Sequence, residues 1–249
     1  MKSRALFLAI SAAALTAVSL LPGVLCAEPF EAPAFTAVKT ITSYDRATGE
    51  IAGAEQLLIA VRSDGSRAQV RTRTAPDGTQ HEQKTIIDVS ARKRLLVDGV
   101  TDSLTTYPLS EKAALHYAVR PVPSCKGADE EAGEMFGFPV RRREREVNDG
   151  GDTIHFEEWV APELNCMVMK RVVRIGEPGG PLRLASVEEI TTLTRGEPAA
   201  SMFALPDRPL TERSPGEVFA EYSRRYGKPV NAGAAAILDR SYQAHRRQR

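Results

Sequence analysis

The feature that most constrains the fold of this chain is a series of Asp-Gly turns between short runs of β-forming residues. These turns lie at Asp64-Gly65, Asp77-Gly78, Asp98-Gly99 and Asp149-Gly150. Glycine adopts positive φ without strain, and an aspartate side chain accepts hydrogen bonds from the turn backbone, so the pair favours tight reversals. Short strands joined by such turns predict an antiparallel meander.

The runs between these turns carry the alternation, or the β-branched and aromatic residues, that are typical of strands. The predicted strands cover residues 35–44, 54–62, 67–74, 85–89, 94–97, 101–107, 141–147, 153–160, 166–175 and 184–194. Helices are predicted at 110–119, capped by Ser110, and at 215–226, where Ser214 and Glu217 form a capping box and Val218, Phe219 and Tyr222 form a buried stripe. Before this second helix, Met202, Phe203 and Leu205 are predicted to form an apolar plug that closes the sheet. We therefore predict a mainly β protein with a few flanking helices.

The amino terminus has the pattern of an export signal. A short basic start is followed by an apolar run from residue 5 to 21 and by Pro22-Gly23, which predicts a signal peptide cleaved after Ala27. Lipidation at Cys26 and an uncleaved anchor are the two alternatives. The predicted domains are a signal peptide (1–27), a β domain (28–212), a capped helix (213–228) and an Ala-rich, basic flexible tail (229–249), which is either a frayed helix or disordered. The expected location is exported, either periplasmic or secreted.

Charge and cysteine content narrow the possible partners. The chain has 33 basic and 32 acidic residues, a balance that gives no electrostatic argument for nucleic acid.

After cleavage, Cys125 and Cys166 remain, and an even pair in an exported chain predicts a disulfide. The bridge would close a loop of roughly 40 residues, worth up to about 4 kcal/mol. Two free buried thiols are the alternative.

Two basic runs have a functional and a structural interpretation. Arg67, Gln69, Arg71 and Arg73 alternate onto one face, which is either an anion-binding face or the solvated outer face of a sheet, and the solvated face is favoured. The 141–146 run reads RRRERE, and its interrupting glutamates favour a salt-bridged, solvent-facing strand over a nucleic-acid site.

Motifs for catalysis or metal binding were not found. The four histidines do not lie at metal-ligand spacing, and no nucleophile elbow or phosphate-binding loop occurs. Glu157-Glu158 and Glu188-Glu189 are adjacent carboxylates, but neighbours in a strand point to opposite faces and cannot act on one bond. We therefore expect no catalytic residues, no metal and no cofactor.

One pattern in the last third of the chain resembles a known family. Trp159-Val160-Ala161-Pro162-Glu163-Leu164 is followed by Gly196-Glu197-Pro198, Phe203 and Pro206. This is similar to an exported bacterial family of unknown function, whose layout resembles the LolA/LolB-like half-barrel of lipoprotein-sorting proteins. The resemblance covers about residues 34–210. It implies a curved antiparallel sheet of about 8–11 strands around helices, with an apolar cavity and no catalytic residue.

These observations lead to two expectations for function. The first is a non-enzymatic, exported binding module that holds a lipid, a lipoprotein acyl chain or another apolar group in the curved sheet. Its expected wall residues are Leu57, Ile59, Phe156, Met167 and Met169. The second is a secreted scaffold with a filled core that contacts another envelope protein. A monomer is expected in either case.

Overall fold

The structure is a computed structural model that describes residues 33–75, 77–117, 125–128, 130–227, 236, 239–240 and 242–244. The predicted signal peptide, with its cleavage site and Cys26, lies outside these residues. Within the described residues, no helix is long and apolar enough to cross a membrane.

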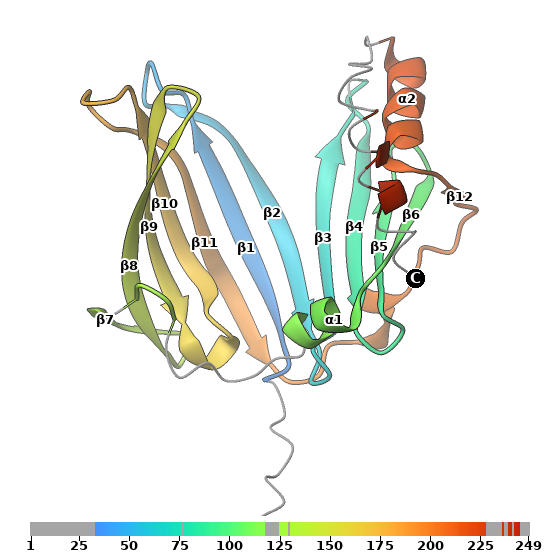
Figure 1. Cartoon of the computed structure of the whole chain (residues 1–249), viewed down its shortest axis with the longest axis horizontal. Helices are drawn as coiled ribbons and strands as arrows, with labels where there is room; N and C mark the ends of the chain where they lie inside the picture. The colour runs from blue at the N-terminus through green and yellow to red at the C-terminus, as the bar shows by residue number, and fades with distance from the viewer. Residues whose placement is uncertain are drawn as a thin grey trace, which may run out of the picture.

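One curved, open sheet of twelve strands, antiparallel except for one short edge strand, forms the molecule, which confirms the predicted fold class (Figure 1). Its spatial order is β12-β6-β5-β4-β3-β2-β1-β11-β10-β9-β8-β7. The strands are β1 (Phe35–Tyr44), β2 (Ile51–Val61), β3 (Arg67–Thr74), β4 (Gln80–Asp88), β5 (Lys93–Asp98), β6 (Ser103–Pro108), β7 (Glu130–Met135), β8 (Phe138–Asp149), β9 (Asp152–Ala161), β10 (Met167–Gly176), β11 (Arg183–Arg195) and β12 (Thr211–Glu212). The helical elements are α1 (Glu111–Tyr117), η1 (Pro162–Leu164), η2 (Ala200–Phe203) and α2 (Pro215–Tyr226).

The sheet consists of two meanders joined by one long-range pair. Strands β1 to β6 form the first meander and β7 to β11 the second, as the turn pattern predicts. Strands β1 and β11, at opposite ends of the β domain in sequence, pair antiparallel from Phe35 opposite Arg195 to Ser43 opposite Ser186. Two of the twelve strands were not predicted. Strand β7 is an acidic segment with little β-propensity, and β12 has two residues that add in parallel to β6.

The Asp-Gly turns form for two different reasons. Gly65 and Gly78 have positive φ angles, and the carboxylates of Asp64 and Asp77 accept from the backbone of Ser66 and Thr79, respectively. Gly99 is needed for close packing instead, because a Cβ there would clash with the Glu82 carbonyl oxygen. The same dipeptide thus reverses the chain in one place and permits a backbone contact in another.

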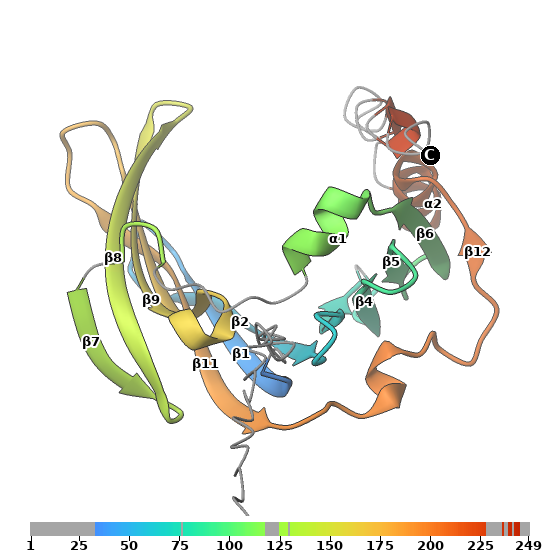
Figure 2. The same ribbon diagram turned by 60° about the horizontal axis from the view of Figure 1, so that its bottom comes forward.

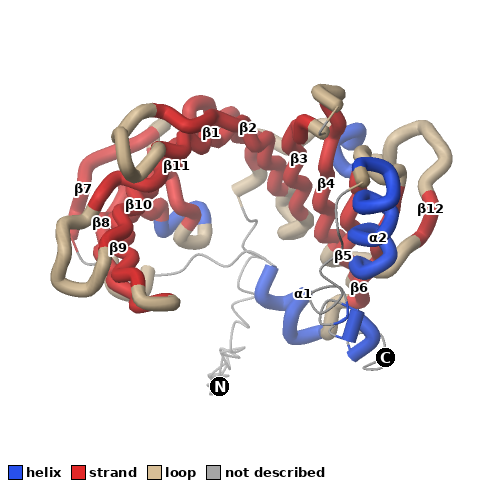
Figure 3. Tube along the Cα trace, turned by 90° about the horizontal axis from the view of Figure 1, so that it is seen from above, coloured by secondary structure: helices blue, strands red, loops and turns tan. Residues whose placement is uncertain are grey.

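The two faces of the sheet have different coverings. Figure 3 shows α1 on the inner side of the arc of strands, and the guanidinium of Arg67 lies 5.6 Å from the ring of Tyr117 in α1. Arg67 therefore faces inward. Figure 2 shows the segment between β11 and β12 passing around the outside of the arc. Met202 and Phe203 of this segment pack against Ala68 and its buried neighbours, so this face of β3 is the outer one.

The outer covering departs from the prediction at one residue. Met202 and Phe203 close the outer cluster of Ala60, Ala68 and Ile86, as expected for a closing plug. Leu205, predicted to join them, is 43% exposed. The main core lies elsewhere and is larger, and its buried residues are Phe35, Ala37, Ile59, Val61, Phe138, Val140, Ala161, Leu164, Met169 and Ile190.

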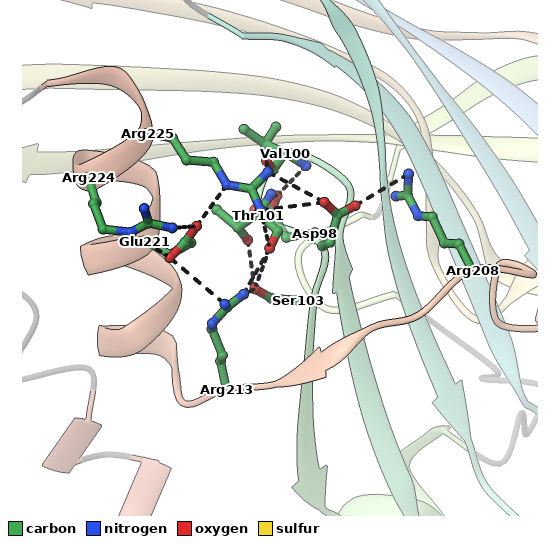
Figure 4. A network of polar contacts seen from close by, with 10 residues as sticks. Asp98, Val100, Thr101, Ser103, Arg208, Arg213, Glu221, Arg224 and Arg225 are labelled. Atoms are coloured by element: carbon green, nitrogen blue, oxygen red, sulfur yellow. Dashed lines mark hydrogen bonds and ion pairs between the residues drawn. The ribbon is translucent and has the colours of Figure 1, made fainter.

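Helix α2 begins and ends where the sequence predicts, with the Ser214–Glu217 capping box and Gly227 in the left-handed conformation at its end. Its docking was predicted less well. Phe219, expected in the buried stripe, is 39% exposed. The helix is attached through polar contacts instead (Figure 4). Arg225 donates to the Val100 and Thr101 carbonyl oxygens, and Arg213 donates to the Thr101 carbonyl and the Ser103 hydroxyl.

Glu221 organises this network. Its carboxylate accepts from Arg224 and Arg225 and lies 3.8 Å from Arg213 Nη2. The hydrogen bonds from Arg224 and Arg225 lower the pKa of Glu221 from 4.5 to about 2.

Of the predicted flexible tail 229–249, the structure describes six residues, all helical, and Tyr242 is buried with its ring 5.1 Å from Tyr107. This part of the segment packs on the domain.

The corner between η1 and β10 is held in an unusual backbone conformation. Asn165 and Cys166 both have left-handed φ angles of 57° and 56°, which cost on the order of 1–3 kcal/mol each outside glycine. The Asn165 amide donates to the Pro162 carbonyl, and Cys166 forms the predicted disulfide with Cys125. Cys125 is buried against Val160, so the bridge fixes the corner to the sheet.

The Glu221 network predicts how α2 responds to acid. Because the folded pKa is depressed, the stabilisation is complete above pH 4.5 and is lost as the pH falls toward 2. We expect Glu221→Gln to lower the urea midpoint at pH 7 and to flatten the fall of the wild-type midpoint between these two pH values. Glu212→Gln is the control, because Glu212 makes no ion pair among the described residues. An unchanged acid profile in Glu221→Gln would contradict the network's role.

The disulfide predicts a measurable loss of stability on its removal. Cys125 and Cys166 are 41 residues apart, so the Cys125→Ser/Cys166→Ser double variant should lose about 2–4 kcal/mol of unfolding free energy. Urea denaturation with and without reductant measures this, and reduced wild-type protein should match the variant. Two reactive thiols in denatured, unreduced protein would rule the bridge out.

Candidate ligand-binding site

A pocket of about 250 Å³ lies on the inner face of the sheet. It is bounded by β1, β2 and β3 on one side and by the η1–β10 corner on the other. The apolar part of its wall consists of Pro33, Phe35, Ile59, Val61, Leu164, Met167 and Val168. The polar part consists of Lys39, Arg67, Gln69, Asn165, Cys166 and Arg171. The disulfide-bonded corner is thus one wall of the pocket.

The five wall residues predicted from the sequence lie on this half of the sheet, but they do not all reach the pocket. Ile59 and Met167 line it. Met169 is fully buried in the main core, and Leu57 packs against the edge of that core. Phe156 is half-buried beneath the guanidinium of Arg145, which lies 3.8 Å from the ring centroid. Their role in binding stays a prediction.

A β-bulge explains why the two methionines differ. The register of β10 on β9 shifts between Val168, which pairs with Val160, and Lys170, which pairs with Trp159. A bulge adds one residue to a strand and changes which side chains share a face. Met169 is the added residue, so the simple alternation that grouped it with Met167 does not hold across this point.

Beside the pocket, a row of ion pairs crosses the inner face from β1 to β8. Lys39 Nζ lies 3.1 Å from a Glu188 oxygen, and the other Glu188 oxygen is 3.1 Å from Arg171. The Nε atoms of Arg171 and Arg143 lie 2.6 and 2.7 Å from the two oxygens of Glu158. We call these five side chains the inner charge row. It joins five neighbouring strands through their side chains.

Glu158 is the centre of the row and is 0% exposed. Burial alone raises the pKa of a carboxyl group, but the hydrogen bonds from Arg143 and Arg171 outweigh it and hold the pKa of Glu158 below its ordinary value. The carboxylate is therefore charged at neutral pH. A buried charge is tolerated when it is paired and hydrogen-bonded in this way, so Glu158 ties β8, β9 and β10 together.

Its neighbour Glu157 points to the outer face, as predicted for adjacent strand residues. Glu157 binds Arg142 and Arg174, and it shares neither arginine with Glu158. The RRRERE run is therefore salt-bridged, as predicted. The prediction that this strand faces solvent is wrong for Arg143, because Arg143 is directed to the inner face, where it pairs with a buried carboxylate.

Arg67 differs from the cations of the inner charge row because no carboxylate pairs with it among the described residues. The residues opposite Arg67 are Val61 on β2 and Ile87 on β4, both apolar. Its Nε atom is buried and has no hydrogen-bond partner in the described part of the chain. Burial lowers the pKa of Arg67. The favoured interpretation of the arginine row as the solvated outer face of the sheet is therefore wrong, because Arg67, Gln69 and Arg71 lie on the inner face and Arg67 is half-buried.

The sequence analysis did not identify Lys39, Arg171, Glu158 and Glu188 as one group. Each lies on a different strand, and no local motif links them. Only the β1–β11 pairing brings Lys39 next to the other three residues. In the residues that the structure describes, no group of three or more His, Cys, Asp or Glu side chains could hold a metal ion.

Comparison with known proteins gives no family. No protein-family model matches the chain, and no curated protein matches it. Among solved structures, a PNGF-II structure is 14% identical over 76% of this chain, with a TM-score of 0.43, and the chain spans 32% of that protein. An uncharacterised conserved protein from Thermus thermophilus is 12% identical over 73% of this chain and 91% of its own, with a TM-score of 0.39. MucB is 18% identical over 74% of this chain and 62% of its own, with a TM-score of 0.32. These likenesses are too low to carry an argument about function.

Proposed function

We propose that this protein is an exported, non-enzymatic binding module that holds one alkyl chain on the inner face of its sheet. The observation that carries the proposal is the pocket between β1–β3 and the η1–β10 corner, with its seven apolar wall residues. Ligand sites are typically concave and mostly apolar, with few polar groups that orient the ligand. In this proposal the open sheet acts as a half-barrel of the LolA/LolB-like kind.

The size of the pocket limits the ligand. At about 250 Å³, it is smaller than the roughly 300–1,000 Å³ of typical small-molecule sites. One alkyl chain fits this volume better than the several chains of a mature lipoprotein. We therefore favour a single-chain lipid over a lipoprotein as the ligand.

Construction of the pocket also supports binding over a purely structural role. The corner that forms one wall keeps two successive non-glycine residues in the left-handed region, and a disulfide holds it there. Backbone strain of this kind is often retained where a site has to be shaped. A scaffold with a filled core would need no such wall. Retention of alkyl chains by the protein separates the two functions.

The test is to measure binding of long-chain alkyl probes to the mature protein purified from a bacterial periplasm. Native mass spectrometry should show a bound mass that organic extraction removes. Binding of a fluorescent long-chain alcohol should fall about tenfold or more in Met167→Asp, because the new carboxylate is buried beside the chain.

Leu205→Asp is the matched control, because Leu205 is exposed and lies outside the pocket. It should bind the probe as the wild type does. A wild-type protein that retains neither a long-chain acid nor a long-chain alcohol would overturn the proposal and leave the scaffold function. Equal losses in both variants would place binding outside the pocket.

A further inference from the structure

We infer that the ligand of the inner pocket carries a single negative charge at its head, a fatty-acid-like carboxylate, and that Arg67 binds it. This inference rests on the proposed function and specifies its ligand. It starts from the difference between Arg67 and the other cations of the pocket wall.

The charges around the pocket do not balance. The inner charge row contains three cations and two carboxylates, and both oxygens of each carboxylate are already engaged. Arg67 adds a further cation, and no acid is found among the residues that line the pocket. Positive charge is therefore in excess where the pocket is enclosed, and an anion would be attracted into it.

Arg67 is also poorly satisfied by the protein itself. Its two cross-strand neighbours are apolar, its Nε has no acceptor among the described residues, and its contact with the Tyr117 ring extends to 5.6 Å. The side chain of Arg67 is half-buried and its Nε atom is fully buried, so a bound anion would compensate a cation that no carboxylate pairs with among the described residues. A guanidinium can bind a carboxylate through two parallel hydrogen bonds, which supplies that partner.

The positions of the pocket residues indicate the chemical class of the ligand. Arg67 lies on the β1–β3 side of the pocket, next to apolar Ile59 and Val61, and Leu164, Met167 and Val168 lie on the corner opposite. A molecule that contacts both sides has a charged head and an alkyl tail. One unpaired guanidinium matches the single charge of a carboxylate better than the double charge of a phosphate monoester. The class that fits is therefore a single-chain fatty acid.

The test compares a long-chain fatty acid with the alcohol of the same chain length, at neutral pH, on the full mature protein. The wild type should bind the acid at least about tenfold more tightly, since a hydrogen bond between two charged groups is stronger than one to a neutral hydroxyl. Arg67→Met should lose this preference and retain binding of the alcohol. Acetate, which has the head and no tail, should not compete.

Arg71→Met is the matched control. Arg71 is on the same strand and the same face, but its Nε donates to Gln83 Oε1 at 2.8 Å and it does not line the pocket. This variant should keep the preference for the acid. Ligand-free Arg67→Met should be at least as resistant to urea as the wild type, because it removes a half-buried charge that no carboxylate pairs with among the described residues, whereas loss of a structural residue would lower the midpoint.

The outcomes separate the two proposals. Equal affinity of the wild type for acid and alcohol, or an acid preference that persists in Arg67→Met, would overturn the role of Arg67 and leave the alkyl-binding function in place. Failure of the wild type to bind either compound would overturn the proposed function itself. A loss of acid preference in Arg71→Met equal to that in Arg67→Met would show a general effect of charge and contradict a specific site.

Discussion

Pairing of β1 with β11 is the interaction on which the rest of the structure depends. Each of the two meanders forms from neighbours in sequence, and this one long-range ladder joins them into a continuous sheet. It brings Phe35 and Ala37 of β1 into the same core as Ile190 of β11. It also places Lys39 beside Glu188, which begins the inner charge row. Without this pairing there would be no inner face to form a pocket.

The inner charge row shows how the sheet tolerates charge on a partly covered face. Glu158 is fully buried, yet two arginines from neighbouring strands satisfy its oxygens. Such a pair is weak evidence for net stability, because desolvation offsets much of the attraction. It does fix the relative positions of β8, β9 and β10, because a displaced strand would leave a buried charge unpaired. Arg67 has no equivalent partner among the described residues, and this contrast gives the pocket its inferred ligand.

Two constraints with different origins meet at the pocket. One wall of the pocket is formed by strands whose alternating side chains favour sheet pairing. The other wall is the η1–β10 corner, where two non-glycine residues adopt the unfavourable left-handed conformation. The disulfide and the Asn165–Pro162 hydrogen bond keep the corner in place. Because the corner is covalently attached to Cys125, which is buried against Val160, it stays against the sheet.

Much of the fold could be predicted from local sequence. Turn chemistry and alternation located ten of the twelve strands, and the capping box located α2. The strands that were missed have no local signal, since β7 is acidic and β12 has only two residues. The buried stripe predicted for α2 failed at Phe219, because polar contacts from Arg225 and Arg213 attach the helix instead.

The candidate site was predicted only in part. Ile59 and Met167 line the pocket, but a bulge moved Met169 into the core, and bulges leave no reliable mark in a single sequence. Sequence by itself determined ten of the twelve strands, the turns, the cysteine pair and the opposite facing of Glu157 and Glu158, because these follow from neighbours along the chain. Tertiary structure alone decided the β1–β11 junction, the burial of Glu158 and the unpaired state of Arg67 among the described residues, because each depends on which distant strands lie side by side.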